Sequence, residues 1–210
     1  MILKDSQETR EHAAALVKAG GLISFRTDTF YGLGADPFNR EALGRLLALK
    51  GREDGKPILL VIADATEVTR FNARGGRLFD ALSARHWPGA LTLVVGARPE
   101  LPEELTAGTG TIGLRLPADE DVRELLRACG GALTATSANR AGEPPARTAT
   151  EAAGAFPEGL ALIIDGGAAR LEAPSTVLDV SGDDEARLIR EGAVSWRVLQ
   201  ETIREAGREK

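Results

Sequence analysis

The chain has 210 residues, of which 43% are hydrophobic, and a formal net charge of −5. A chain of this length can bury one substantial core, so we expect a single domain over residues 1–210. The acidic balance argues against a broad nucleic-acid surface, since such surfaces rely on many cations that contact phosphates.

The predicted compartment is reducing. Cys129 is the single cysteine and cannot form an internal disulfide. No apolar run approaches the roughly 20 residues that span a bilayer, and the amino end lacks the apolar core of a secretory signal. We therefore expect a cytoplasmic protein with no membrane partner.

The first third of the chain predicts a helix, a strand and a second helix. Asp5 or Ser6 can cap a helix that stops at the glycines at 20 and 21, and an apolar run over 22–25 favours a buried strand. A polar turn with two glycines follows over 27–34. Asn39 can then cap a helix over 40–49 that ends at a glycine.

The middle of the chain alternates strands and helices. Apolar runs predict strands over 58–62, 90–95 and 111–116, and helical spacing predicts a helix over 77–86. The strand over 111–116 carries Arg115 among apolar neighbours, which marks this arginine as a candidate pocket residue. Asp119 can cap another helix, after which a strand is expected over 132–136.

The last third begins with a polar loop from Ser137 that is longer than a tight connection, a length typical of functional loops. Strands are expected over 160–164, 175–180 and 186–189, and a final helix over 195–206. The pattern as a whole predicts an α/β fold.

Two groups of polar residues suggest an anionic ligand. Thr27 and Thr29 directly follow a buried strand, where open α/β sheets often bind ligands, and Lys50 and Arg52 stand at the end of the next helix. Each group also has an ordinary structural reading, as a turn and as a solvated helix end.

Neither common nucleotide signature is complete. Gly32 and Gly34 lack the third glycine of a dinucleotide fingerprint, and no P-loop occurs. Cations elsewhere could instead clamp a triphosphate: Lys50, Arg52, Lys56, Arg115 and Arg190. Only two histidines are present and neither belongs to a ligand cluster, so we expect no protein metal site.

Several short motifs occur together in one order along the chain. They are Thr27-Asp28-Thr29-Phe30-Tyr31-Gly32-Leu33-Gly34, Lys50-Gly51-Arg52 with Lys56-Pro57, Trp87-Pro88-Gly89-Ala90-Leu91-Thr92, Gly113-Leu114-Arg115-Leu116-Pro117, Ser137-Ala138-Asn139, Pro174-Ser175-Thr176-Val177 and Arg190-Glu191-Gly192. In this order they resemble the YrdC-like threonylcarbamoyl-AMP synthase family, in its short form without an additional carboxyl-terminal domain.

The resemblance implies a single α/β domain, with a twisted, mixed β-sheet flanked by helices around a large concave cationic site. It also implies condensation of L-threonine, bicarbonate and ATP to threonylcarbamoyl-AMP, with release of pyrophosphate. Mg²⁺ is expected with ATP. A downstream complex would transfer the group to tRNA, and a weak tRNA contact is possible.

The resemblance also assigns roles to individual residues. Thr29, Arg115 and Ser175 match the threonine side. The ATP side takes Arg52, Lys56, Ser137, Asn139 and Arg190. Lys50 and Arg52 would act as the catalytic cations near the carbamate and phosphates.

Three positions depart from the family pattern. Arg26 and Glu191 replace frequent prolines, and Val61 stands where some members carry a histidine near threonine. Two alternatives remain open: an RNA-binding or ribosome-associated module that uses the same cleft, and a carbamoyl-transfer enzyme. The acidic charge weighs against the first, and the lack of zinc-finger cysteines weighs against the second.

Overall fold

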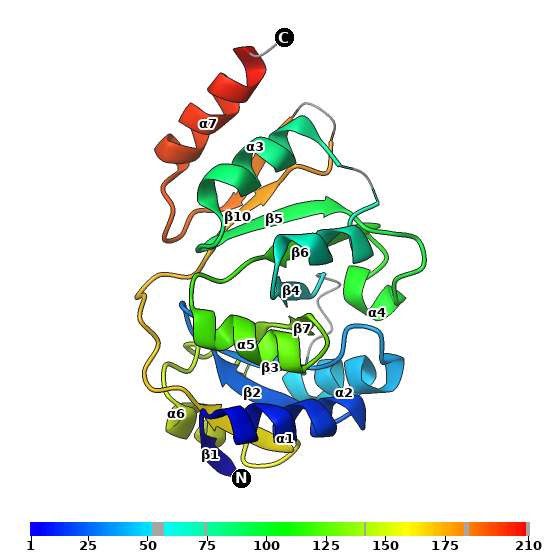
Figure 1. The fold of residues 1–210 in the computed structure, drawn as a ribbon, viewed down its shortest axis with the longest axis vertical. Helices are drawn as coiled ribbons and strands as arrows, with labels where there is room; N and C mark the ends of the chain where they lie inside the picture. Colours follow the sequence, from blue (N-terminus) through cyan, green and yellow to red (C-terminus); the bar gives the residue numbers. More distant parts are fainter. Residues whose placement is uncertain (52–56, 74, 141, 183–184, 209–210) are drawn as a thin grey trace.

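The computed structural model describes residues 1–51, 57–73, 75–140, 142–182 and 185–208. Its strands form two mixed sheets, which occupy opposite halves of the molecule (Figure 1). The first sheet has the order β1 (Ile2–Lys4), β9 (Leu162–Asp165), β2 (Ile23–Arg26), β3 (Tyr31–Gly34) and β8 (Thr136–Ser137). In this sheet β9 runs parallel to β1 and β2, whereas β3 runs antiparallel to β2 and β8.

The second sheet has the order β11 (Arg187–Arg190), β10 (Thr176–Asp179), β5 (Leu91–Gly96), β6 (Thr111–Arg115), β4 (Leu59–Ile62) and β7 (Ala132–Thr134). It is mixed as well, because β10 runs parallel to β5 while β6 runs antiparallel to β5. The expected α/β fold with mixed pairing is confirmed, and its strands divide between two sheets.

Helices flank both sheets. They are α1 (Gln7–Lys18), α2 (Arg40–Lys50), α3 (Arg77–His86), α4 (Glu103–Thr106), α5 (Glu120–Ala128), α6 (Ala149–Ala155) and α7 (Trp196–Arg208), with a 3-10 helix η1 (Ala65–Arg70). Figure 1 shows α1, α2 and α6 beside the first sheet and α3 with α7 at the far end of the second. Within the described ranges, no helix combines the length and apolar character that a bilayer crossing requires.

Local sequence signals set the helix ends. Ser6 caps α1, Asn39 caps α2 and Asp119 caps α5, each with a side-chain oxygen that accepts a backbone N–H of the first turn. Gly51 ends α2 with a φ of 64°, in the left-handed region that glycine adopts without strain. These caps were all predicted, with Ser6 rather than Asp5 serving α1.

The predicted strand over 132–136 is two elements. β7 pairs with β4 in the second sheet, and β8 pairs with β3 in the first. Ala135 lies between them and donates its N–H to the carbonyl of Leu59 at 2.8 Å. The chain therefore crosses from one sheet to the other here, which brings Ser137 into the space between the sheets.

The core has two clusters of buried apolar side chains. The larger contains Leu43, Leu60 and Leu93, and the smaller contains Phe25 and Leu125. In the smaller cluster α1 and α5 pack against each other and against the first sheet, while α5 also contacts β4 and β7 of the second. Helix α5 is therefore a rigid connection between the two sheets.

Candidate active site

A cavity of about 930 Å³ lies where the two sheets face each other. One wall is a face of the second sheet. The opposite wall comes from the turn after β2, from β3 and from β8, with Thr29 and Ser137 among its lining residues. This volume falls at the upper end of the range for small-molecule pockets, so the cavity can hold a ligand as large as a nucleotide.

Strand alternation decides which side chains of the second sheet reach the cavity. Alternate residues of one strand point to the same face, and both Leu59 and Val61 of β4 line it. Val61 pairs in register with Arg115 of β6 and is fully buried. The position where some family members carry a histidine is therefore an apolar part of the wall beside Arg115.

Arg115 is nearly fully buried, with a side-chain exposure of 2%. Its Nη1 donates to the hydroxyl of Thr29 at 3.1 Å, its Nε donates to the carbonyl of Gly89 at 3.1 Å, and its Nη2 pairs with the carboxylate of Asp28. Burial lowers the pKa of Arg115 to about 9, with the like charge of Arg190 as the second cause. The guanidinium remains charged at neutral pH and is fixed against Thr29.

The turn after β2 is closed by its own hydroxyl. Thr27 Oγ1 donates to the carbonyl of Phe30 at 2.7 Å and accepts the N–H groups of Thr29 and Phe30, both at 3.3 Å. Thr27 and Asp28 thus form the expected turn, and this turn is part of the site. Asp28 also accepts the N–H of Leu171 through its carbonyl, so its segment is held from both sides.

Ser175 and Arg190 come together at the same end of the cavity. The hydroxyls of Ser175 and Thr92 are 2.9 Å apart, and Arg190 Nη2 donates to the carbonyl of Ser175 at 2.9 Å. Burial lowers the pKa of Arg190. Ser175 is 3% exposed, so its hydroxyl lies inside the wall with Thr92 as its neighbour.

Lys50 meets the polar loop that starts at Ser137. Its Nζ donates to the carbonyls of Ser137 and Asn139, both at 2.6 Å, and to Asn139 Oδ1 at 2.8 Å. Ser137 Oγ donates to the same Oδ1 at 2.6 Å. The amide of Asn139 donates to the carbonyls of Arg140 and Glu143. Three predicted residues, from two separate parts of the chain, therefore form one connected group.

Two predicted site residues, Arg52 and Lys56, lie outside the described residues. In the described part of the cavity lining the charged side chains are Arg115, Arg187, Arg190 and Asp179. Arginines outnumber carboxylates there, while Asp28 pairs with one of them from the side. A positive charge for the cavity as a whole remains a prediction.

Sequence reasoning gave no role to several residues that line the cavity. Thr92 belongs to one of the quoted motifs. Side chains alternate between the two faces of β5, and this alternation could have predicted that Thr92 and Val94 face the same side. Arg187 and Asp179 form an ion pair at 3.0 Å across β10 and β11. Asp179 and Arg187 are partners in the antiparallel register of β10 and β11, a register that the strand prediction did not include.

Other reactive groups lie apart from the cavity lining. Burial raises the pKa of the Cys129 thiol to about 12, so it is a poor nucleophile at neutral pH. His86 Nε2 lies 2.8 Å from the hydroxyl of Thr202, at the contact between α3 and α7. Across the described ranges there is no group of three or more His, Cys, Asp or Glu side chains that could hold a metal ion.

The model of the Sua5/YciO/YrdC family, described as "Telomere recombination", matches residues 15–192. This chain belongs to the Sua5/YciO/YrdC family. A relative from Thiobacillus denitrificans named threonylcarbamoyl-AMP synthase is 38% identical over 178 residues, which are 83% of this chain and 94% of the relative. A Bacillus subtilis relative of the same name is 33% identical over 192 residues, or 91% of this chain.

Solved structures of the family have the same fold. The crystal structure of Pyrococcus abyssi Sua5 in complex with L-threonine superposes with a TM-score of 0.92 at 30% identity and covers 97% of this chain. The chain spans 61% of that Sua5 protein and 55% of the Bacillus subtilis relative. The likeness to these longer family members therefore concerns the part that they share with this chain.

Proposed function

We propose that this protein is an L-threonylcarbamoyladenylate synthase, which condenses L-threonine, bicarbonate and ATP to threonylcarbamoyl-AMP and releases pyrophosphate. The observation that carries the proposal is the buried guanidinium of Arg115 beside the Thr29 hydroxyl, at one end of a cavity large enough for an amino acid and a nucleotide together. The shared name of the relatives supports the same activity.

The amino acid would bind at the Arg115 end. A guanidinium can hold a carboxylate with two parallel N–H···O bonds, and Arg115 has N–H groups beyond those that Thr29, Gly89 and Asp28 accept. The hydroxyls of Thr29 and Ser175 can bond the polar atoms of threonine. Val61 gives this end an apolar surface suited to a methyl group.

ATP would occupy the Lys50 end. Ser137 and Asn139 would contact the nucleotide, with Arg52 and Lys56 on the phosphates. Arg190, which bonds the carbonyl of Ser175 and lines the cavity, would reach the phosphates from the threonine end. Lys50 and Arg52 would act on the reacting groups, since Lys50 is the last residue of α2 and Arg52 follows it two residues later in the sequence.

The chemistry explains why cations are needed. The amine of threonine joins bicarbonate to give a carbamate and water, and a carbamate oxygen then attacks the α-phosphorus of ATP while pyrophosphate leaves. Both reactants are anions, so fixed positive charges must offset their repulsion in the transition state. Mg²⁺ would arrive on the triphosphate, held by phosphate oxygens and water.

The wider role rests on the same proposal. The product would be passed to a complex that modifies tRNA, with at most a weak direct tRNA contact. We further propose that residues 1–210 act as one catalytic domain and that the reaction takes place in the cytoplasm.

The test is an omission assay with purified protein. Pyrophosphate and an adenylated threonine carbamate should form only when ATP, threonine and bicarbonate are all present, with the product identified by mass spectrometry. Pyrophosphate release that is independent of threonine or bicarbonate would contradict the proposal. Absence of product together with tight tRNA binding would favour the RNA-binding alternative.

A further inference from the structure

Two segments meet beside the threonine end of the cavity. One is the turn over 27–30 after β2, and the other is the loop over 116–119 that joins β6 to α5. Asp28 of the first segment pairs with Arg115, which precedes the second. Arg26, which precedes the first, pairs with Asp119 of the second at 2.7 Å. In one pair the carboxylate lies in the turn, and in the other it lies in the loop. The two ion pairs therefore join the same two segments.

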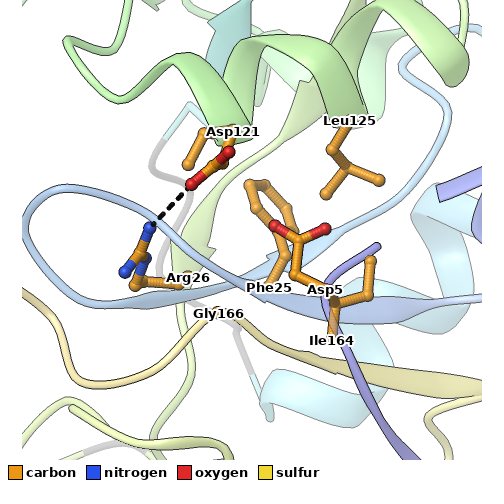
Figure 2. A pocket seen from close by; sticks show the side chains of 8 residues that line it. Asp5, Phe25, Arg26, Asp121, Leu125, Ile164 and Gly166 are labelled. Atoms are coloured by element: carbon orange, nitrogen blue, oxygen red, sulfur yellow. Dashed lines mark ion pairs between the residues drawn. The ribbon is translucent and has the colours of Figure 1, made fainter. Parts of the chain in front are cut away.

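The Arg26–Asp119 pair is buried. The two side chains are 9% and 3% exposed, and Asp119 also caps α5 through the N–H of Asp121 at 3.2 Å. Figure 2 shows Arg26 extending from β2 toward the start of α5, with Asp121 as a second carboxylate at 3.8 Å. Because α5 packs against strands of the second sheet and shares a buried cluster with Phe25 and Ile164 of the first, this pair connects the turn to a helix held by both sheets.

The surroundings of Arg26 indicate a packed junction. A Cβ placed on Gly166 would lie 3.2 Å from Arg26 Nε, so the glycine leaves the space that the guanidinium occupies. The hollow beside it has a volume of about 10 Å³, which is at the limit for a single water molecule. The site is too small for a ligand, so a role for Arg26 must act through its neighbours.

We propose that Arg26 and Asp119 are positioning residues for the threonine end. The contacts of Arg115 with Asp28 and Thr29 join the two segments at one point, and the Arg26–Asp119 pair joins them at a second point, which restricts how the segments can turn relative to each other. Together they hold the Thr29 hydroxyl 3.1 Å from Arg115 Nη1. This inference rests on the proposed function, because it takes that contact as part of the threonine site.

The test variant is Arg26→Gln, which keeps a polar side chain but removes the charge. Its matched control is Arg127→Gln, which removes an arginine that pairs with Asp64 and Glu120 on the exposed side of α5. We expect Arg26→Gln to weaken threonine binding about tenfold by calorimetry, because small displacements of a binding group lower affinity steeply. Affinity for a non-hydrolysable ATP analogue should stay within about twofold of the parent value.

Further measurements separate positioning from general destabilisation. Arg26→Lys restores the charge and should recover part of the threonine affinity. Hydrogen exchange of the amides over 27–31 should be faster in Arg26→Gln, while the amides of β10 and β11 keep their rates. Each of three results would overturn the inference. They are unchanged exchange over 27–31, unchanged threonine affinity, and an equal loss of threonine and nucleotide affinity.

The same experiment distinguishes this inference from the proposed function. If the parent protein binds no threonine, the proposed function fails. Faster exchange over 27–31 in Arg26→Gln, but not in Arg127→Gln, would still support the positioning role. If the parent protein binds threonine and both variants bind it equally well, the positioning role fails while the proposed function stands.

Discussion

The end of the cavity around Arg115 differs from the group that Lys50 forms with Ser137 and Asn139, of which Ser137 lines the cavity, in what holds the polar side chains. Arg115 ends β6 and Ser175 directly precedes β10, two strands of one sheet that both pair with β5, and both residues are almost completely buried. Lys50 stands at the end of a helix and bonds a loop, mainly through the backbone carbonyls of Ser137 and Asn139. Strand pairing fixes the first end, while a lysine-centred set of hydrogen bonds fixes the second.

This difference suits the two proposed ligands. An amino acid is small and is recognised by a few groups at fixed positions, which a packed sheet can provide. A triphosphate is long and highly charged, and binding residues on loops are common for such ligands. If the two groups bind these two different ligands, substitutions in one should lower threonine affinity and substitutions in the other should lower nucleotide affinity.

The largest separation is expected at Arg115. Arg115→Ala would leave Asp28 buried without its charged partner, which costs on the order of 3–5 kcal/mol of stability. A loss of threonine affinity in that variant would then not separate lost binding from lost folding. Arg115→Lys keeps the charge but loses the planar fork that bonds a carboxylate twice. We expect threonine affinity to fall about 100-fold and nucleotide affinity to change by less than about threefold, both measured by calorimetry.

The control for Arg115→Lys is the thermal midpoint of the same sample, which shows whether the variant is folded at the titration temperature. Threonine affinity close to the parent value in a folded variant would remove Arg115 from the site. Equal losses for both ligands would instead mean that the two ends are not independent.

A smaller effect is expected at Lys50. Lys50→Ala removes a charged donor of hydrogen bonds to Ser137 and Asn139. Loss of such bonds is worth about 2 kcal/mol, so nucleotide affinity should fall roughly 30-fold. Lys18→Ala is the matched control, because Lys18 is the last residue of α1 and is exposed. A larger loss for threonine than for nucleotide would contradict the assignment of Lys50 to the phosphate end.

The same contrast explains what the sequence could predict. Helices α2 and α3 follow from local spacing and capping residues and were predicted within about one residue at each end, and the start of α5 was predicted at its cap, Asp119. Strands β1 and β3 were missed, because a short strand is defined by its partners. β1 forms only through β9, which lies about 160 residues away in the sequence.

The site was predictable to a similar degree. Thr29 and Arg115 were assigned through the resemblance, since no periodicity relates residues so far apart in the chain. Asp28 was interpreted as a turn residue, and its turn does form, but its ion pair with Arg115 depends on the approach of two distant segments. The Lys50 contacts with the loop likewise required the crossing of the chain between the two sheets at Ala135.

The smallest effect that still distinguishes the two ends is expected at Ser175. Ser175→Ala removes a hydroxyl 2.9 Å from that of Thr92, while the backbone carbonyl that accepts from Arg190 remains. Loss of one neutral hydrogen bond corresponds to about 1 kcal/mol, so threonine affinity should fall roughly fivefold without a change in nucleotide affinity. Ser83→Ala is the control, because this serine lies on α3 and bonds only within its own helix turn in the described contacts. A drop in nucleotide affinity instead would move Ser175 to the other end of the cavity, and with it the boundary between the two ligands.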